Sequence, residues 1–105
     1  AIVLPDSVLT NRGTRYVREW IEGIAMVRAI ISLPVETFTP FGANIKTSVL
    51  YLRKWDRGEL RSRSYPTCLV RVDNVGYDAN GRPNDKADLK DASEKLREFI
   101  DKEGW

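Results

Sequence analysis

The sequence contains no histidine and a single cysteine, Cys68. Without histidine the chain lacks the usual general base, which excludes Ser-His-Asp and Cys-His catalysis and most zinc sites. One cysteine excludes an internal disulfide framework and indicates a reducing compartment, so we expect a cytoplasmic protein. No apolar run approaches the roughly 20 residues that span a bilayer, so we expect no membrane partner. The apolar start AIVL has no basic segment before it, so we also expect no signal peptide.

Nucleotide-binding motifs are also missing, since neither a GxxxxGK(S/T) loop nor a GxGxxG turn occurs in the chain. The acidic residues of segment 88–101 alternate with lysines at helical spacing, which is typical of a solvated, salt-bridged helix face rather than a catalytic carboxylate pair. Cys68 lies within the apolar stretch TCLVRV and is expected to be a buried strand residue rather than a reactive thiol.

The composition is that of a globular protein. The chain has 105 residues, of which 42% are hydrophobic and 10% aromatic, and this indicates one small domain or a piece of a larger one. Because the chain opens inside an apolar run with no initiator methionine, we expect it to be a fragment. The net charge is +2, but segment 46–72 holds seven basic against two acidic side chains, whereas segment 73–105 holds six against nine.

The first third of the sequence predicts a strand, a helix and a second strand. Residues 1–4 form a continuous apolar run, as in a strand covered on both faces. Segment 14–25 predicts a helix with Thr14 or Asn11 as its cap, and its apolar face is formed by Val17, Trp20, Ile21 and Ile24. Segment 26–33 is rich in β-branched residues and predicts a strand parallel to the first, which completes a βαβ unit.

The remainder predicts two more strands and a second helix. A Pro- and Gly-containing loop at 34–45 precedes a third strand at 46–55, and a charged turn at 56–66 precedes a short fourth strand at 67–72 that can form a hairpin with the third. After a loop at 75–84, segment 88–101 predicts an amphipathic helix. Asn84 or Asp85 can cap this helix, and its apolar face consists of Leu89, Ala92, Leu96, Phe99 and Ile100.

Three features have both a functional and a structural interpretation. Pro5-Asp6 follows the first strand at the sheet edge where ligands bind in parallel sheets, but a strand end and a turn is the favoured interpretation. Phe38 and Phe41 can stack on a base or fold back onto the core. The basic stretch 46–71 can contact phosphates or simply discourage edge pairing. The residues alone leave these alternatives open.

Four blocks of the sequence carry a family resemblance, and together they cover nearly the whole chain. AIVLPDSVLTN, RYVREWI, VRAIISLPVETFTPFGANIKTSVLYLRK and VGYDANGRPND occur in that order. They resemble the carboxyl-terminal part of an N6-adenine DNA methyltransferase domain, in particular the modification (M) subunit of type I restriction-modification systems. TFTPFGANIKTSVLYLRK is the most specific block. Ser7 stands where the family commonly has glycine, and this departure does not disturb the match.

The resemblance implies a fold. The family has an α/β fold, the class I S-adenosylmethionine-dependent methyltransferase (Rossmann-like) sheet with one antiparallel strand. Residues 1–4 would be its fifth strand, 26–33 its sixth, and KTSVLYLRK its seventh, returning antiparallel into the gap beside the first. We therefore expect the carboxyl-terminal part of such a sheet, β-α-β-β plus a terminal helix, with residues 1–72 forming the partial sheet and 73–105 the loop and amphipathic helix.

The resemblance also implies an activity for the parent protein, which is methyl transfer from S-adenosylmethionine to adenine N6 in DNA. The family's Gly-rich cofactor turn and its Asn-Pro-Pro-aromatic motif are both absent from these residues. We therefore expect no catalytic, cofactor-binding or metal-binding residue here, no bound cofactor, and no activity of the chain alone. The expected partners are DNA and the specificity and restriction subunits of such a system.

The residues carried over from the family concern the DNA. Such enzymes flip the target adenine out of the duplex and stack it on aromatic side chains. The matching position here is Phe41 or, less favoured, Phe38, and the expected contacts with the DNA backbone are Lys46, Arg53 and Lys54. A partial sheet exposes an unpaired edge, so self-association is also expected. The alternative function is a stand-alone, non-enzymatic module that binds nucleic acid or protein.

Overall fold

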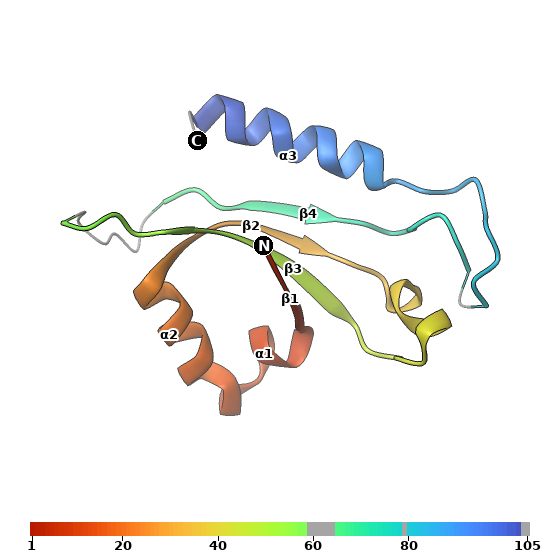
Figure 1. The fold of residues 1–105 in the computed structure, drawn as a ribbon, viewed down its shortest axis with the longest axis horizontal. Coiled ribbons are helices and arrows are strands. Elements are labelled where there is room, and N and C mark those ends of the chain that lie inside the picture. Colours follow the sequence, from red (N-terminus) through yellow and green to blue (C-terminus); the bar gives the residue numbers. More distant parts are fainter. Residues whose placement is uncertain (59–64, 79, 104–105) are drawn as a thin grey trace.

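The fold is a four-stranded mixed sheet with two helices on one face and a third helix on the other (Figure 1). It is known from a computed structural model that describes residues 1–58, 65–78 and 80–103. None of the helices in these ranges is long and apolar enough to cross a membrane. The elements are β1 (Ile2–Pro5), α1 (Asp6–Thr10), η1 (Arg12–Thr14), α2 (Arg15–Ile24), β2 (Ala25–Ser32), η2 (Val35–Thr37), η3 (Thr39–Phe41), β3 (Thr47–Lys54), β4 (Cys68–Arg71) and α3 (Leu89–Glu103).

The strand order is β1-β3-β2-β4. β3 is antiparallel to both β1 and β2, so these two strands run in the same direction with β3 inserted between them. The sequence prediction of two parallel strands, with a third returning into the gap beside the first, is confirmed. The predicted hairpin between the third and fourth strands is wrong, because β1 and β2 already occupy both edges of β3. β4 instead pairs in parallel with β2, from Ala29↔Cys68 to Ser32↔Arg71.

The amino-terminal helices are held together by hydrogen bonds to carbonyl groups of α1. The five-residue helix α1 was not predicted from the sequence, and α2 starts at Arg15. Thr14 does not cap α2 with its side chain, because its hydroxyl donates to the carbonyl oxygens of Ser7 (2.8 Å) and Val8 (3.0 Å). Arg18 donates to the Val8 carbonyl oxygen as well, at 2.9 Å.

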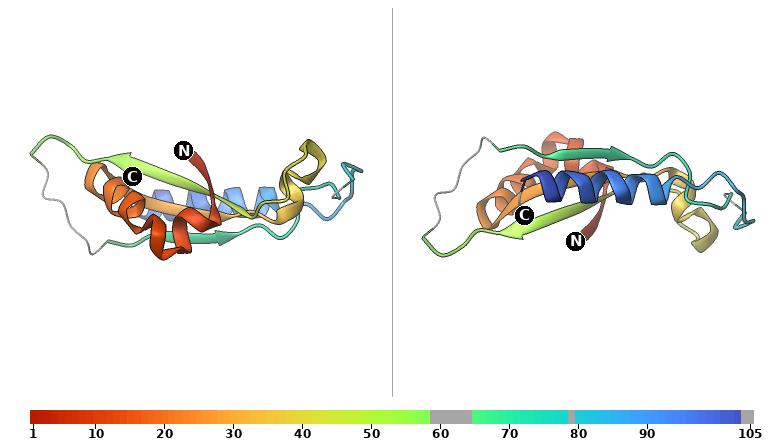
Figure 2. Two further views of the ribbon diagram at one scale, coloured as in Figure 1. Left: turned by 90° about the horizontal axis from the view of Figure 1, so that it is seen from below. Right: turned by 90° about the horizontal axis from the view of Figure 1, so that it is seen from above.

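The apolar face predicted for α2 is only partly buried. Ile21 is 7% exposed and packs toward the sheet, whereas Trp20 is 66% exposed and Ile24 is 44% exposed. The helix is ten residues long and covers one part of the sheet, so the outer side of the predicted stripe meets solvent. Figure 2 shows the same arrangement from below and from above, with α1 and α2 on the face opposite α3.

A cluster of buried hydrophobic residues lies between the sheet and α3. Its buried members are Leu33, Val70, Val72 and Ala92. The prediction that Asn84 or Asp85 caps this helix is wrong, because Asp88 directly precedes it and its carbonyl oxygen accepts the Ala92 amide at 3.0 Å. In the loop before α3, the Asn84 side-chain oxygen instead accepts a hydrogen bond from the Lys86 amide.

Candidate functional site

The loop between β2 and β3 is built from two consecutive 3-10 turns. The amide of Phe41 donates to the Phe38 carbonyl oxygen at 3.0 Å, and the amide of Gly42 donates to the Thr39 carbonyl oxygen at the same distance. Gly42 closes the second turn with φ of 91°, a left-handed conformation that a side chain would strain. This loop leaves β2 at the sheet edge where the parallel strands β1 and β2 both end.

The two phenylalanines of this loop have opposite environments. Phe38 is partly buried and packs against the core cluster beneath α3. Phe41 lies three residues further on and is 79% exposed. Of the two interpretations left open by the sequence, core packing therefore describes Phe38, while the Phe41 ring is free to contact another molecule. Its stacking on a base stays a prediction.

The loop is braced by the segment that follows β4. The hydroxyl of Tyr77 donates a hydrogen bond to the Thr37 carbonyl oxygen. In the same segment a β-carbon placed on Gly81 would lie 3.4 Å from the Pro40 side chain, so that backbone approaches the loop closely. The TFTPFG and GYDANGR parts of the sequence, about forty residues apart, therefore meet in space. Sequence periodicity contained no signal for this contact.

A polar cluster lies beside the loop, at the ends of the strands. The Lys46 ammonium donates to Ser32 Oγ (2.5 Å) and to the Leu33 carbonyl oxygen, and it lies 3.9 Å from Asp6 Oδ2. The other carboxylate oxygen of Asp6 accepts the Ser48 hydroxyl at 2.9 Å. Asp6 thus has a structural partner in β3, which agrees with the structural interpretation of Pro5-Asp6, and Lys46 is tied to the end of β2.

The three predicted contacts with the DNA backbone do not lie together. Lys46 and Arg53 are seven positions apart along nearly extended chain, which is about 23 Å at about 3.3 Å per residue. Arg53 Nη1 lies 3.4 Å from Asp56 Oδ2, and Lys54 is exposed at the end of β3. A phosphate contact by Lys46 would have to replace one of its internal hydrogen bonds, whereas Lys54 is accessible. Two arginines of the basic stretch, Arg61 and Arg63, lie outside the described residues.

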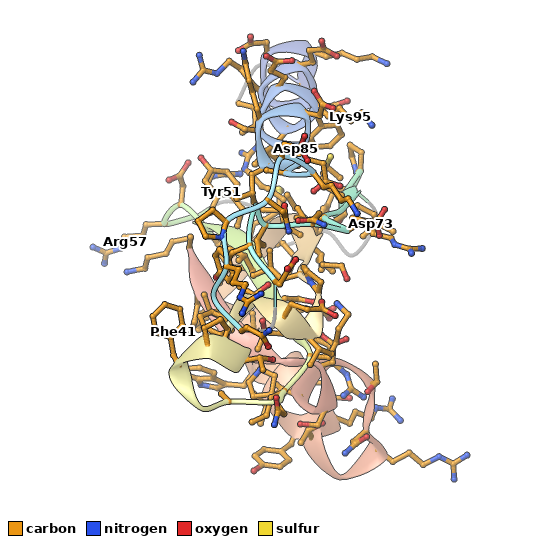
Figure 3. The ribbon with its side chains drawn as sticks, turned by 90° about the vertical axis from the view of Figure 1, so that its right-hand side faces the viewer. Phe41, Tyr51, Arg57, Asp73, Asp85 and Lys95 are labelled. Atoms are coloured by element: carbon orange, nitrogen blue, oxygen red, sulfur yellow. The ribbon has the colours of Figure 1, made fainter. Side chains whose placement is uncertain are left out.

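The two long sides of the molecule differ in their side chains. Viewed from the end that carries the phenylalanine loop (Figure 3), Phe41, Tyr51 and Arg57 lie on one side, and Asp73 and Lys95 on the other. Phe41 and Tyr51 are both exposed, at 79% and 37%. Phe41, Tyr51 and Arg57 therefore share the side away from β4.

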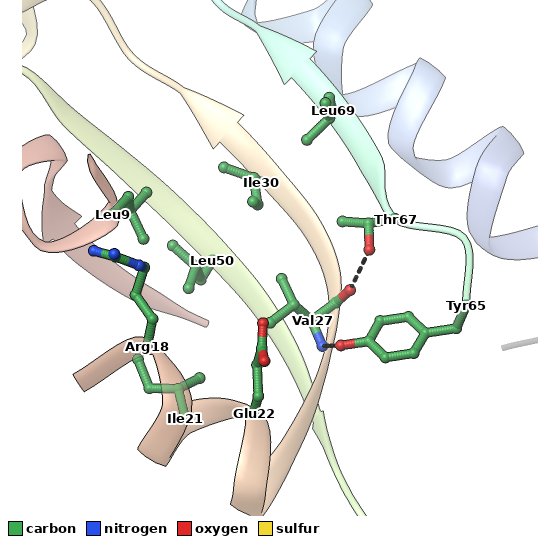
Figure 4. A pocket seen from close by; sticks show the side chains of 10 residues that line it. All are labelled: Leu9, Arg18, Ile21, Glu22, Val27, Ile30, Leu50, Tyr65, Thr67 and Leu69. Carbon is green, nitrogen blue, oxygen red and sulfur yellow. Dashed lines mark hydrogen bonds between the residues drawn. The ribbon is translucent and has the colours of Figure 1, made fainter. Parts of the chain in front are cut away.

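A cavity of about 370 Å³ lies on the opposite face of the sheet from α3, between α2 and β4 (Figure 4). Its lining is largely apolar and includes Ile30, Leu50 and Leu69, with Arg18 and Glu22 at the α2 side. Since Phe41 does not line it, this cavity is separate from the phenylalanine loop. Sequence reasoning did not predict it, because it depends on how far α2 extends across the sheet.

The pKa values of Asp88 and Cys68 are shifted, and neither residue lies in the phenylalanine loop. Hydrogen bonds, first that from the Asp73 amide, lower the pKa of Asp88, and its own desolvation opposes this. Burial raises the pKa of the Cys68 thiol, which disfavours the reactive thiolate. Within the described ranges no three histidine, cysteine or acidic side chains gather closely enough to hold a metal ion.

Comparison with known protein families and with curated proteins finds no match to this sequence. The site is a loop held by backbone hydrogen bonds, with an exposed aromatic ring, at the end of two parallel strands.

Proposed function

We propose that this chain is part of a DNA methyltransferase that transfers a methyl group from S-adenosylmethionine to adenine N6, as in the modification subunit of type I restriction-modification systems. Within that protein, Phe41 forms one wall of the pocket for the flipped adenine. The observation that carries the proposal is the exposed ring of Phe41 on a turn held by backbone hydrogen bonds and braced by a second loop. An enzyme that flips a base needs such a preformed stacking surface.

The strand order supports the same proposal. The resemblance places an antiparallel strand between two parallel ones, and β3 lies between β1 and β2 in this way. In open α/β sheets ligands bind outside the carboxyl ends of the parallel strands, which is where the phenylalanine loop lies. The finer assignment to a class I methyltransferase sheet is part of the proposal.

The residues of this chain do not fit the methyl donor. A donor of this type needs glycine-rich backbone where a strand turns into a helix. The junction of this kind between β1 and α1, Pro5-Asp6, has no glycine and leads into a helix of only five residues. The donor site and the catalytic groups must therefore come from other parts of the parent protein, and the proposed role of this chain is to hold the target base.

The stacking role is tested in the full-length parent enzyme by methyl transfer to duplex DNA. Phe41→Ala removes a stacking surface worth about 1–3 kcal/mol, so kcat/KM should fall by roughly 5- to 150-fold. Phe41→Trp keeps a stacking ring and should retain most of the activity. Val35→Ala, in the same loop and 39% exposed, is the matched control and should leave the rate unchanged. Equal rates for Phe41→Ala and the unaltered enzyme would exclude the role.

The coding sequence tests the larger proposal. The region upstream of this segment must encode a glycine-rich strand-turn and an Asn-Pro-Pro-aromatic motif, because the chain contains neither. If both are missing there, the enzyme proposal fails, and the alternative of a non-enzymatic nucleic-acid- or protein-binding module takes its place.

A further inference from the structure

The outer edge of β4 is an unpaired strand edge. The Val72 amide donates to the Ser32 carbonyl oxygen of β2 at 2.8 Å. Because backbone groups alternate in direction along a strand, Val70 and Cys68 also face β2, whereas Leu69 and Arg71 direct their amide and carbonyl groups away from it. Within the described residues, β4 pairs with β2 alone. Two outward amides and two outward carbonyls are therefore available for another strand.

The second edge of the sheet is less suited to accept a strand. The Asp6 amide donates to the Lys46 carbonyl oxygen of β3 at 2.9 Å, so the same alternation directs Val3 and Pro5 outward from β1. Proline has no amide hydrogen, and a proline at such a position blocks pairing. β4 contains no proline between Cys68 and Arg71. Of the two edges, the edge of β4 is the one open to another chain.

We propose that two copies of this chain pair antiparallel through the outer edges of β4, about a two-fold axis at Val70. The Leu69 of one copy then lies opposite the Arg71 of the other. Since both residues present their backbone groups outward, these two symmetric pairs form four inter-chain hydrogen bonds. The product is a continuous eight-stranded sheet. The proposal does not depend on the proposed function.

The side chains at this edge favour a second copy as the occupant. Leu69 is 76% exposed, and the Arg71 side chain is 81% exposed while it remains paired with Asp73 at 2.6 Å. Across the two-fold axis, the aliphatic stem of each arginine would cover the leucine of the other copy. This removes an exposed leucine from water without separating the arginine from its own carboxylate partner.

Under the same symmetry, the charges on α3 of one copy are complementary to those on α3 of the second copy. A groove of about 320 Å³ runs between the β4 edge and α3, and Asp91 and Lys95 line it from the helix. α3 runs antiparallel to β4 (Figure 1), and Ala92 packs in one cluster with Val70. An axis at Val70 therefore passes near the middle of the Asp91–Lys95 pair, and each aspartate faces the lysine of the second copy. The pairing leaves the side with Phe41 and Tyr51 uncovered (Figure 3).

The test compares two proline variants by sedimentation over a concentration series, with circular dichroism to verify folding. Arg71→Pro removes an outward amide without removing a bond to β2, and it should weaken dimerisation at least tenfold. Val3→Pro makes the same change on the β1 edge and should leave the dimer unchanged. If Arg71→Pro does not fold, Leu69→Lys decides, because it places like charges opposite each other at an exposed position and should weaken the dimer similarly.

A charge exchange tests the symmetry. Asp91→Lys places two lysines of each copy against those of the other and should weaken dimerisation about three- to tenfold. Asp91→Lys combined with Lys95→Asp restores opposite charges across the axis and should restore the affinity. The proposal is overturned if the unaltered chain stays monomeric at about 1 mM, if Val3→Pro rather than Arg71→Pro dissociates the dimer, or if the double exchange is no better than the single one.

Discussion

Asp88 shows how one side chain can connect two elements. Its carboxylate accepts the amides of Asp73 (3.0 Å) and Asn74 (3.1 Å), which lie just after β4, and its carbonyl oxygen accepts the first-turn amide of α3 from Ala92. These bonds favour the ionised carboxylate, and the bond from the Asp73 amide is the main reason that the pKa of Asp88 is lowered. The start of α3 is thereby fastened to the end of β4.

The lowered pKa makes stability depend on pH in a definite direction. A carboxyl group whose pKa is depressed in the folded state stabilises the fold fully above its unfolded pKa of about 3.9, and this contribution is lost as pH falls through the folded value. Asp88→Ala should therefore lower the melting temperature at pH 7, and the difference from the unaltered chain should shrink toward zero in acid. Asp101→Ala, on the exposed side of α3, is the control. A difference that is constant from pH 7 to pH 2 would contradict this account.

At the scale of the element, β2 contains an irregularity, and side chains from a distant segment bond to the backbone beside it. Its register against β3 shifts between Val27 and Ala29, which interrupts the ladder. The Tyr65 hydroxyl accepts the Val27 amide at 3.0 Å, and the Thr67 hydroxyl donates to the Val27 carbonyl oxygen at 2.9 Å (Figure 4). Two side chains that precede β4 thus bond both backbone groups of Val27, the residue next to the irregularity.

Tyr65→Phe removes the acceptor of the Val27 amide. The free energy of unfolding should fall by about 1 kcal/mol, since a partly buried donor loses its hydrogen bond. Amide hydrogen exchange should become faster at Val27 in particular. Tyr16→Phe, at a tyrosine that is 71% exposed, is the matched control and should change neither quantity. Unchanged protection at Val27 in Tyr65→Phe would show that the hydroxyl does not hold this amide.

At the scale of the whole molecule, the two lateral sides of the sheet differ in their exposed side chains. The side with Phe41, Tyr51 and Arg57 is aromatic and basic, and the side with Asp73 and Lys95 has mixed charge (Figure 3). Under the two proposals above, a nucleic acid would contact the first surface and a second copy of the chain would contact the second. Because the two surfaces are on opposite sides, the two proposed partners would not compete for the same residues.

The salt dependence of DNA binding should show which side of the molecule contacts DNA. If Lys54 contacts one phosphate, Lys54→Ala should reduce the slope of log K against log salt concentration by about 0.9. Lys90→Ala removes the same charge from exposed α3 and should leave the slope unchanged. Equal slopes for the two variants would indicate that DNA does not bind along the β3 side.

Local patterns were sufficient for most of the elements. The segments predicted as strands at 26–33 and 46–55 and as a helix at 88–101 correspond to β2, β3 and α3 within two residues. Periodicity reports which neighbours along the chain share a face, and that is a local property. α1 has only five residues, too few for a period to be recognised. The pairing of β4 escaped prediction because it depends on which sheet edges the earlier strands had already occupied.

For the candidate site, too, some features could be predicted from the sequence and others could not. The sequence by itself determined that Phe38 and Phe41 lie in a Pro- and Gly-containing loop after a buried strand, and that no histidine or metal cluster of the usual kind accompanies them. Only the tertiary structure decided that Phe38 packs under α3 while Phe41 is exposed, and that Lys46 is held next to Asp6. Burial and ion pairing depend on segments about forty residues apart that meet only when the sheet forms. No local pattern contains that information.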